Sequence, residues 1–403
     1  MTAATNHLVT GIGSVSAFGT WSGLIGASPP HPATITRWPT RSPRRAYLVP
    51  RFKAGDIVPG LKTRRLDLLT VWAIVAAHLA IEDAGVDTTA LNPSRVAIVF
   101  GTGFGCLERT EAFLASANRY GYGSADPIIF PETLANAPAS HVARVFGFRG
   151  PNITLSCRGV SGETALIQAR SLLNAGEADL AIVLAGDMLT RPLYEWYEAA
   201  AVLSNACFEE DSKAPVPFSR ESDGFFPGEG MAAMVLEPAA LRRGSRVGTY
   251  ARVIDALAGV EPGVSLGSWG RSPSPTVELI RKLAGEATDI RLVVSSANGS
   301  VALDRLEGEV ILACFEEGGG TIVSAPKTVS GEFEASGVLR LALALSGQGG
   351  SWHTSAFIGS DSPGLPSGAS VPDRGFALLL GTSAGGGRAA VLLEMLPRPA
   401  PRE

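Results

Sequence analysis

The sequence predicts an α/β protein with buried strands. Short runs of β-branched and other apolar residues recur along the chain, and each is followed by glycine-rich punctuation and then by a helical pattern. The chain has 403 residues, of which 45% are hydrophobic and 18% are charged. A chain of this size and composition can bury a large core, as one compact two-lobed domain or as two closely joined ones.

The clearest strands are aliphatic runs that are long enough for a buried strand and short for a helix. They occupy residues 95–100, 180–184 and 291–294. Helices are expected where apolar residues recur at helical spacing and a glycine follows, because glycine is a common helix stop. These helices occupy residues 66–84, before Gly85, and residues 163–174, before Gly176.

A weak internal repeat predicts how the elements are organised. Residues 153–173 read as a strand, a polar turn and an apolar helix, and residues 321–345 repeat that order. The two turns carry similar tripeptides, Val160-Ser161-Gly162 and Val329-Ser330-Gly331. Two copies of one supersecondary unit indicate an internal duplication. We therefore expect two halves, residues 1–240 and 241–403, in one integrated unit, with the division near the polar connector at residues 242–245 and no flexible linker.

Composition and charge argue against several classes of function. No stretch approaches twenty uninterrupted apolar residues, so we expect no membrane span. The first residues lack the basic and apolar blocks of a signal peptide, which predicts a cytoplasmic protein. The net charge of −4 does not indicate a basic surface for nucleic acid. A local basic cluster is expected to be a solvated loop; its members are Arg37, Arg41, Arg44, Arg45 and Arg51.

The cysteines lack the spacing of a metal site. Four are scattered along the chain, namely Cys106, Cys157, Cys207 and Cys314. In a reducing compartment such cysteines are free thiols, so neither zinc nor disulfides are expected, and we predict no cofactor.

Ordered motifs along nearly the whole chain resemble those of β-ketoacyl synthases. In chain order they are Val9-Thr10-Gly11-Ile12-Gly13, the segment 150–162, Pro217-Phe218-Ser219-Arg220 with Asp223-Gly224-Phe225 and Gly228-Glu229-Gly230, Ala325-Pro326-Lys327 leading to Gly331, and Gly385-Gly386-Gly387. The resemblance implies a thiolase-like fold, with two βαβ-rich halves in five αβαβα layers, and a dimer.

The same resemblance implies that the catalytic centre is degenerate. An active ketosynthase uses a cysteine at the start of a buried helix and two histidines, whereas this chain has Gly159, Asn298 and Glu332 at those positions. Glycine offers no nucleophile, and asparagine donates a hydrogen bond but transfers no proton near neutrality. An ionised Glu332 would oppose an enolate by about 4 kcal/mol for charges ~4 Å apart at an effective dielectric of ~20. A gating phenylalanine is also replaced, by Ala384.

Four other features have competing readings. If the strand continues through Cys157, that residue lies roughly 6–7 Å before position 159, so we expect a buried core thiol, with a displaced nucleophile as the alternative. His141 is expected in a helix as a packed or surface residue, since no acidic orienter is evident, and His353 is expected in a loop. The glycines at 385–387 are expected to allow close backbone packing and not to bind phosphate.

Degenerate ketosynthases of this kind resemble the chain-length factors of type II polyketide synthases, including subunits of polyene-forming systems. The resemblance implies a heterodimer with an active ketosynthase, whose growing chain is delivered by an acyl carrier protein and extends into a tunnel at the interface. Side chains of the factor would limit chain length sterically, because overpacking costs roughly 1–3 kcal/mol.

Two segments are expected to form this tunnel. On the helix within residues 104–114, Leu107, Thr110 and Leu114 share one face and are predicted to line the cavity with Phe104; the face of Cys106, Arg109 and Phe113 is the alternative. From residues 127–136 the predicted lining is Ile129, Thr133 and Leu134. Two other functions remain open: an acyltransferase or ketosynthase that uses Cys157, and a non-catalytic homodimeric lipid-binding protein.

Overall fold

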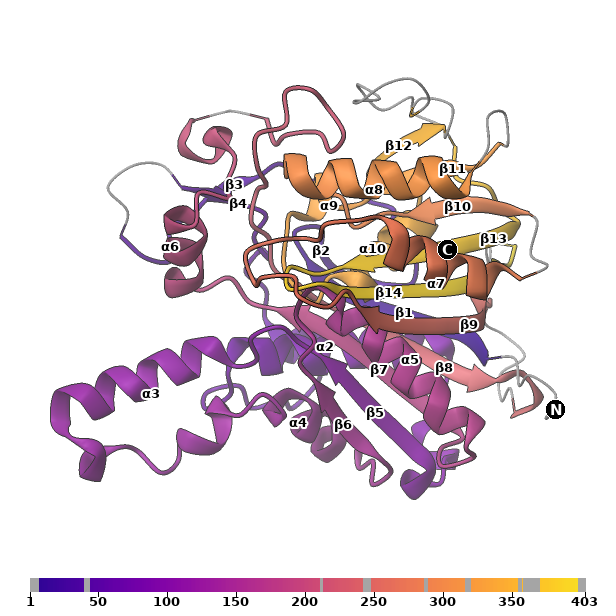
Figure 1. Ribbon diagram of the computed structural model, residues 1–403. Coiled ribbons are helices and arrows are strands. Elements are labelled where there is room, and N and C mark those ends of the chain that lie inside the picture. The colour runs from indigo at the N-terminus through magenta and orange to yellow at the C-terminus, as the bar shows by residue number, and fades with distance from the viewer. Residues whose placement is uncertain are drawn as a thin grey trace.

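A large mixed sheet runs through the molecule, with helices on both of its faces (Figure 1). The computed structural model describes residues 7–39, 44–210, 213–241, 248–285, 289–315, 320–353, 357 and 370–397. Within these residues the sheet has twelve strands. The chain has the predicted thiolase-like α/β fold.

The sheet repeats one strand order. In the N-terminal half the order is β6-β5-β7-β8-β1, with β1 (His7–Ser16), β5 (Val96–Gly101), β6 (Asn152–Leu155), β7 (Leu180–Asp187) and β8 (Gly230–Pro238). In the C-terminal half it is β11-β10-β13-β14-β9, with β9 (Ala251–Val260), β10 (Ile290–Val294), β11 (Ile322–Ala325), β13 (Gly375–Thr382) and β14 (Gly387–Met395). Taken in chain order, the five strands of each half occupy the same places. The connector predicted at residues 242–245 lies outside the described residues.

The two halves meet where β1 pairs with β9 in antiparallel fashion. β2 (Gly19–Ser22) extends β1, and β12 (Gly350–His353) pairs with β11 at the far edge. His353 therefore belongs to a strand, and the expectation of a loop was wrong. A separate ribbon is formed by β3 (Ala33–Thr34) and β4 (Arg45–Ala46).

The helices complete five layers. α5 (Ser161–Asn174) and α10 (Gly337–Leu345) contact each other and pack between the two halves of the sheet. α2 (Leu68–Ala84) and α4 (Ala137–Phe146) cover the outer face of the N-terminal half, and α7 (Ser274–Ala284) and α8 (Val301–Cys314) cover that of the C-terminal half. The remaining α-helices are α1 (Ala54–Ile57), α3 (Leu107–Tyr120), α6 (Arg191–Ala199) and α9 (Lys327–Ser330).

Single 3₁₀ turns lie mostly in the connections. They are η1 (Thr88–Ala90), η2 (Pro93–Arg95), η3 (Tyr122–Ser124), η4 (Phe130–Thr133), η5 (Arg158–Val160), η6 (Asn205–Phe208) and η7 (Ala239–Leu241).

The aliphatic runs form strands because they supply apolar side chains to both faces. In β5, Ile98 and Phe100 face the outer helices, whereas Ala97 and Val99 face the central layer, as alternation along a strand requires. The glycines of the first motif have a steric role. A Cβ at Gly11 or Gly13 would overlap the backbone of α2, so these glycines allow the long helix to lie directly on β1.

The basic cluster is solvated only in part, because three of its arginines have partners within the protein. Arg37 pairs with the buried carboxylate of Glu229, Nη1 to Oε2 at 2.6 Å, and Arg44 pairs with Glu198 at 2.6 Å. Arg45 is buried and donates to the carbonyl of Pro32 at 2.9 Å. A buried carboxylate needs a counter-charge, which explains why Arg37 turns inward. Arg51 is exposed, and Arg41 lies outside the described part of the chain.

A fully buried ion pair joins the two central helices. Arg340 of α10 contacts Glu163 in the first turn of α5, and its Nη1 also donates to the carbonyls of Ser295 and Leu380, both at 2.9 Å. Burial raises the pKa of Glu163, and Arg340 opposes this rise. The pair therefore links both central helices to β13 and to the residue that follows β10.

Removing Arg340 should destabilise the fold strongly. Arg340→Met leaves the Glu163 carboxylate buried without its counter-charge, which costs about 3–5 kcal/mol, whereas the double variant Glu163→Gln/Arg340→Met should recover much of that loss. Thermal and urea unfolding measure the effect.

The matched control is Arg252→Met, which breaks a half-exposed pair with Glu394 at 2.6 Å and should cost about 1 kcal/mol or less. Equal losses in Arg340→Met and Arg252→Met would contradict the structural role of the buried pair.

Candidate functional site

Gly159, the position predicted to lack the nucleophile, lies in the turn that leads into α5. β6 ends at Leu155, and the single turn η5 leads into α5. The backbone N–H of Cys157 donates to Ser161 Oγ at 2.9 Å, and that of Gly159 donates to Ser383 Oγ at 3.0 Å. Arg158 has a φ of 54°, a left-handed conformation that is strained for a side chain with a Cβ. The sharp turn is thus retained, and Gly159 is buried within it.

The two other positions that are predicted to be degenerate, Asn298 and Glu332, contact each other. Asn298 Nδ2 donates to Glu332 Oε2 at 2.6 Å, and Lys327 Nζ donates to the same oxygen at 2.6 Å. All three side chains are buried. The positive charge of Lys327 offsets the negative charge of Glu332. The expected repulsion of an enolate assumed an isolated carboxylate, and Glu332 is not isolated. The amide N–H of Asn298 is likewise engaged within the protein.

Two buried aspartates hold the surrounding backbone. Asp304 accepts from the N–H groups of Asn298 at 3.0 Å, Gly299 at 3.2 Å and Phe218 at 2.7 Å. Burial raises the pKa of Asp304 to about 7, although these donors oppose the rise.

Asp187, at the end of β7, joins the loop after β5 to the segment that follows Glu332. It accepts from Thr102 Oγ1 at 2.7 Å, Phe104 N at 3.0 Å and Ala335 N at 2.9 Å. Burial also raises the pKa of Asp187.

The segment 332–334 connects all three predicted positions. Glu332 binds Asn298, and two residues later the carboxylate of Glu334 approaches Gly159. Arg158 Nη2 lies 3.4 Å from Glu334 Oε1, and burial raises the pKa of Glu334 to about 7 despite this arginine. The structure therefore brings Gly159, Asn298 and Glu332 into one polar cluster.

The sequence reasoning missed Glu334, Arg158 and Asp304. A second acidic residue in the apolar stretch after Glu332 was the available signal for Glu334. Nothing in the sequence showed that Arg158 would turn toward it.

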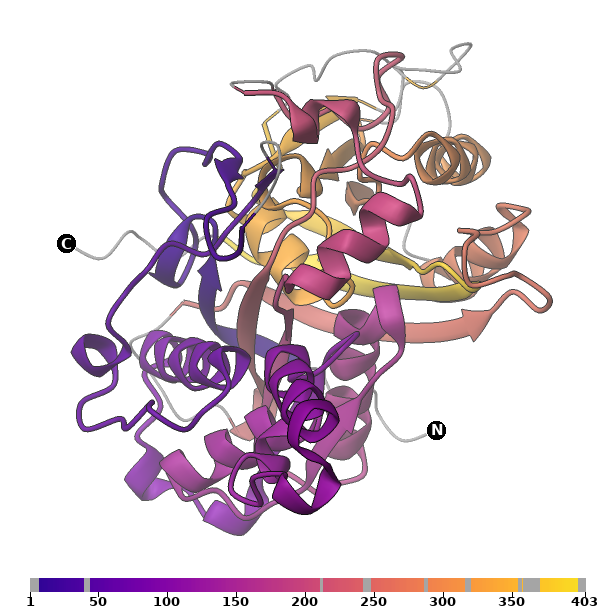
Figure 2. The ribbon, with the colours of Figure 1, turned by 90° about the vertical axis from the view of Figure 1, so that its left-hand side faces the viewer.

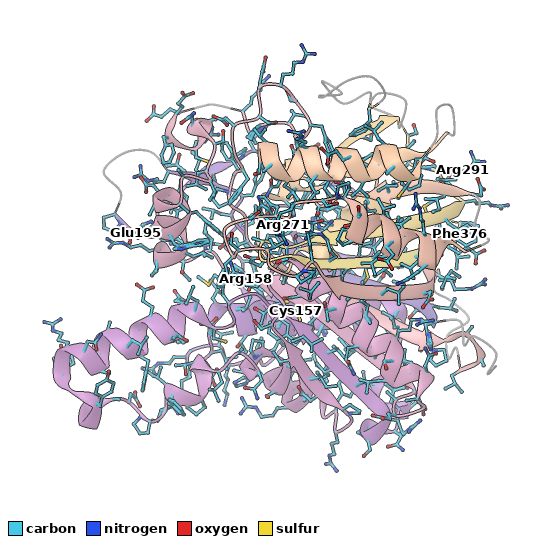
Figure 3. All side chains as sticks on the ribbon, in the orientation of Figure 1. Cys157, Arg158, Glu195, Arg271, Arg291 and Phe376 are labelled. Atoms are coloured by element: carbon cyan, nitrogen blue, oxygen red, sulfur yellow. The ribbon has the colours of Figure 1, made fainter. Side chains whose placement is uncertain are left out.

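Cys157 is not the buried core thiol that was expected. The strand ends before it, so the assumed continuation was wrong, and Cys157 is only half-buried next to the start of α5. Figure 3 shows Cys157 and Arg158 near the middle of the molecule, where the two halves meet.

His141 has the acidic partner that the sequence did not reveal. It lies in α4 as predicted and is buried, with Nε2 2.7 Å from Glu132 Oε1, while Arg144 Nη2 lies 2.6 Å from Nδ1. Glu132 comes from η4, nine residues before His141 in the chain. Since Nδ1 accepts from the guanidinium, Nε2 carries the proton and donates to Glu132. The cluster fastens η4 to α4.

The helix predicted within residues 104–114 is α3, which forms the outgoing half of a projecting arm. α3 and the returning segment 121–136 extend away from the body in Figure 1, and α3 points toward the viewer in Figure 2. In the arm, Phe113 packs on Phe130 with ring centroids 5.7 Å apart.

The predicted lining residues lie along this arm. Phe104 and Leu107 are half-buried at its base against an aromatic cluster that includes Tyr194, and Thr110 Oγ1 lies 3.2 Å from the carbonyl of Thr133. Ile129 and Thr133 are half-buried, whereas Leu114 and Leu134 are each 45% exposed. The alternative face turns inward: Cys106 is buried, and Arg109 Nη2 donates to the carbonyl of Leu66 at 2.8 Å.

The glycine-rich segment near the C-terminus packs as predicted. A Cβ at Gly386 would lie 2.5 Å from the carbonyl oxygen of Glu261, so the backbones approach too closely for any other residue. Across the described ranges, no group of three or more His, Cys, Asp and Glu side chains is arranged to hold a metal ion. No helix there has the length and apolar character needed to cross a membrane.

Comparison with solved structures identifies the fold. The ishigamide ketosynthase/chain length factor superposes with a TM-score of 0.81 at 19% identity, covering 98% of this chain and 100% of that chain. A type II polyketide synthase ketosynthase in complex with its acyl-carrier protein superposes with a TM-score of 0.78 at 16% identity, covering 98% and 100%.

Sequence comparison gives closer relatives over part of the chain. The 3-oxoacyl-(acyl-carrier-protein) synthase 2 of Vibrio cholerae is 30% identical over 257 residues, which are 61% of this chain and 61% of the relative. The tetracenomycin polyketide synthase ketoacyl synthase alpha subunit of Streptomyces glaucescens is 30% identical over 223 residues, 53% of this chain and 52% of the relative. These alignments thus span less than two thirds of each relative.

A family model described as the N-terminal domain of β-ketoacyl synthases matches residues 32–241, more than half of the chain. The matched region contains β5, the turn at Gly159 and the Gly228-Glu229-Gly230 motif. The chain belongs to the β-ketoacyl synthase family.

Proposed function

We propose that this protein is a non-catalytic chain-length factor that pairs with an active ketosynthase and shapes the tunnel that limits polyketide length. One observation carries the proposal: the fold of a condensing enzyme is complete around the start of α5, yet Gly159 gives it no nucleophile. Asn298 and Glu332 are bound to each other and to Lys327 inside the protein. The scaffold therefore serves a role that needs shape and not a reactive side chain.

The projecting arm supports a protein partner. It exposes large apolar side chains that a stable surface normally covers, namely Leu114, Tyr120, Tyr122, Ile128, Phe130 and Leu134. In the proposed heterodimer this arm lies against the active ketosynthase, and Phe104, Leu107, Thr110, Leu114, Ile129, Thr133 and Leu134 contribute to the tunnel wall. An acyl carrier protein delivers the growing chain to the cysteine of the partner subunit.

The half-buried position of Cys157 favours one alternative, an acyltransferase or ketosynthase that uses this thiol as a displaced nucleophile. The exposed arm alone is also compatible with a homodimeric lipid-binding protein. The experiments below separate these alternatives.

The arm should determine pairing. We expect the chain to co-purify with a co-expressed type II ketosynthase in equal amounts, and Leu114→Asp/Leu134→Asp to weaken that pairing at least tenfold, because two charges would be buried in an apolar contact. Size-exclusion chromatography with mass determination measures the stoichiometry.

Leu312→Asp is the matched control, since Leu312 is 44% exposed on α8, away from the arm. A homodimer that persists in the presence of the ketosynthase would contradict the proposed role.

The isolated chain should form no acyl-enzyme. Incubation with malonyl- and acyl-loaded carrier protein, followed by intact-mass measurement, is expected to show no adduct and no release of carbon dioxide. A stable adduct that is lost in Cys157→Ala would establish the displaced nucleophile instead.

Side-chain volume at the base of the arm should set product length. In the complex, Leu107→Ala is expected to lengthen the products and Leu107→Trp to shorten them, because each added unit needs apolar volume. Mass spectrometry of the released products measures the change. Leu312→Ala serves as the control, and an unchanged length distribution in both Leu107 variants would remove this residue from the tunnel wall.

A further inference from the structure

The vacated nucleophile position is not an empty pocket. A Cβ built on Gly159 would lie 3.2 Å from Glu334 Oε2 on one side and 3.1 Å from Ser383 Cα on another. Both distances are shorter than ordinary van der Waals contacts. Ser383 contributes backbone, which cannot move away, whereas Glu334 contributes a side chain. The space that a residue-159 side chain would need is thus already enclosed.

Two glycines make room for Glu334. A Cβ at Gly103 would overlap the Cβ of Glu334, so the glutamate can cross the loop after β5 only because residue 103 has no side chain. At its other end, the carboxylate reaches the bare backbone of Gly159. Gly103, Gly159 and Glu334 are therefore complementary in shape, although they come from three separate segments.

Arg158 holds the carboxylate in place. Its Nη2 lies 3.4 Å from Glu334 Oε1, and its guanidinium lies over the ring of Phe104, 5.7 Å from the centroid. Arg158 adopts a left-handed φ of 54°. A strained backbone of this kind persists where its surroundings hold it. The contacts with Glu334 and Phe104 are part of those surroundings.

We propose that Glu334, held by Arg158, occludes the degenerate nucleophile site, so that the start of α5 is filled by the protein itself and cannot receive a thioester. The carboxylate takes the volume at the start of a buried helix where the family places a thiolate. The Glu334 side chain is 11% exposed, and this burial raises its pKa to about 7. This inference goes beyond the proposed function, because the site would be closed whether or not the chain pairs with a ketosynthase.

A reporter thiol tests the occlusion. Gly159→Cys places a cysteine at the site, and its rate of alkylation by iodoacetamide in the native protein reports access. Trypsin cleaves after Arg149, Arg158 and Arg170, so this cysteine and Cys157 fall in separate peptides. Cys157 then provides an internal reference in every sample.

Removal of the glutamate side chain should open the site. We expect Gly159→Cys/Glu334→Ala to be alkylated at position 159 at least tenfold faster than Gly159→Cys alone. Gly159→Cys/Glu334→Gln should stay protected, because glutamine keeps the volume and removes only the charge. Equal rates in the alanine and parent backgrounds would overturn the proposal, and so would equal opening by alanine and glutamine.

A second measurement avoids the reporter, in case the cysteine variant fails to fold. Gly159→Ala should lower the Tm more in the parent chain than in Glu334→Ala, because the added methyl group meets Glu334 only in the former. Identical shifts in the two backgrounds would overturn the proposal. Neither readout needs a partner subunit, so a failure here is distinct from a failure of the chain-length role.

Discussion

The contact between Glu163 and Arg340 is the interaction on which the architecture depends. It lies between α5 and α10, the two helices of the central layer, and Arg340 also donates to a carbonyl in β13 and to the carbonyl of the residue that follows β10. Gly337 and Gly381 lie so close to Glu163 that a Cβ at either would meet its carboxylate. A buried pair of this kind is weak evidence for stability as such, but its loss is costly, because it would leave one charge unpaired. It therefore fixes how the halves fit together.

The same layer shows how the turn at Gly159 is held. α5 is tied to α10 by the ion pair, and the turn that leads into α5 is held by hydrogen bonds to the hydroxyls of Ser383 and Ser161. These bonds are made by backbone N–H groups and serine hydroxyls, so none of them depends on a side chain at residue 159.

The polar cluster around Asn298, Glu332 and Glu334 is largely paired within the protein. Lys327 and Asn298 both donate to one carboxylate oxygen of Glu332, Asp304 holds the backbone at Asn298, and Arg158 faces Glu334, although Arg158 Nε is buried with no hydrogen-bond partner among the described residues. Buried polar groups that are paired make the region rigid. By contrast, the arm exposes its apolar residues, so the structure is closed around Gly159 and leaves apolar surface at the place proposed to meet a partner.

The sequence by itself determined the strands at β5, β7 and β10, the helices α2 and α5 and the thiolase-like fold, because these follow from local periodicity and from ordered motifs. The degenerate character of positions 159, 298 and 332 stays a prediction from those motifs. Tertiary structure alone decided the rest. Arg37 pairs with Glu229, and Glu334 reaches Gly159 from a segment 175 positions further along the chain. Such contacts depend on packing between distant segments, and local sequence patterns carry no record of which distant side chain fills a given space.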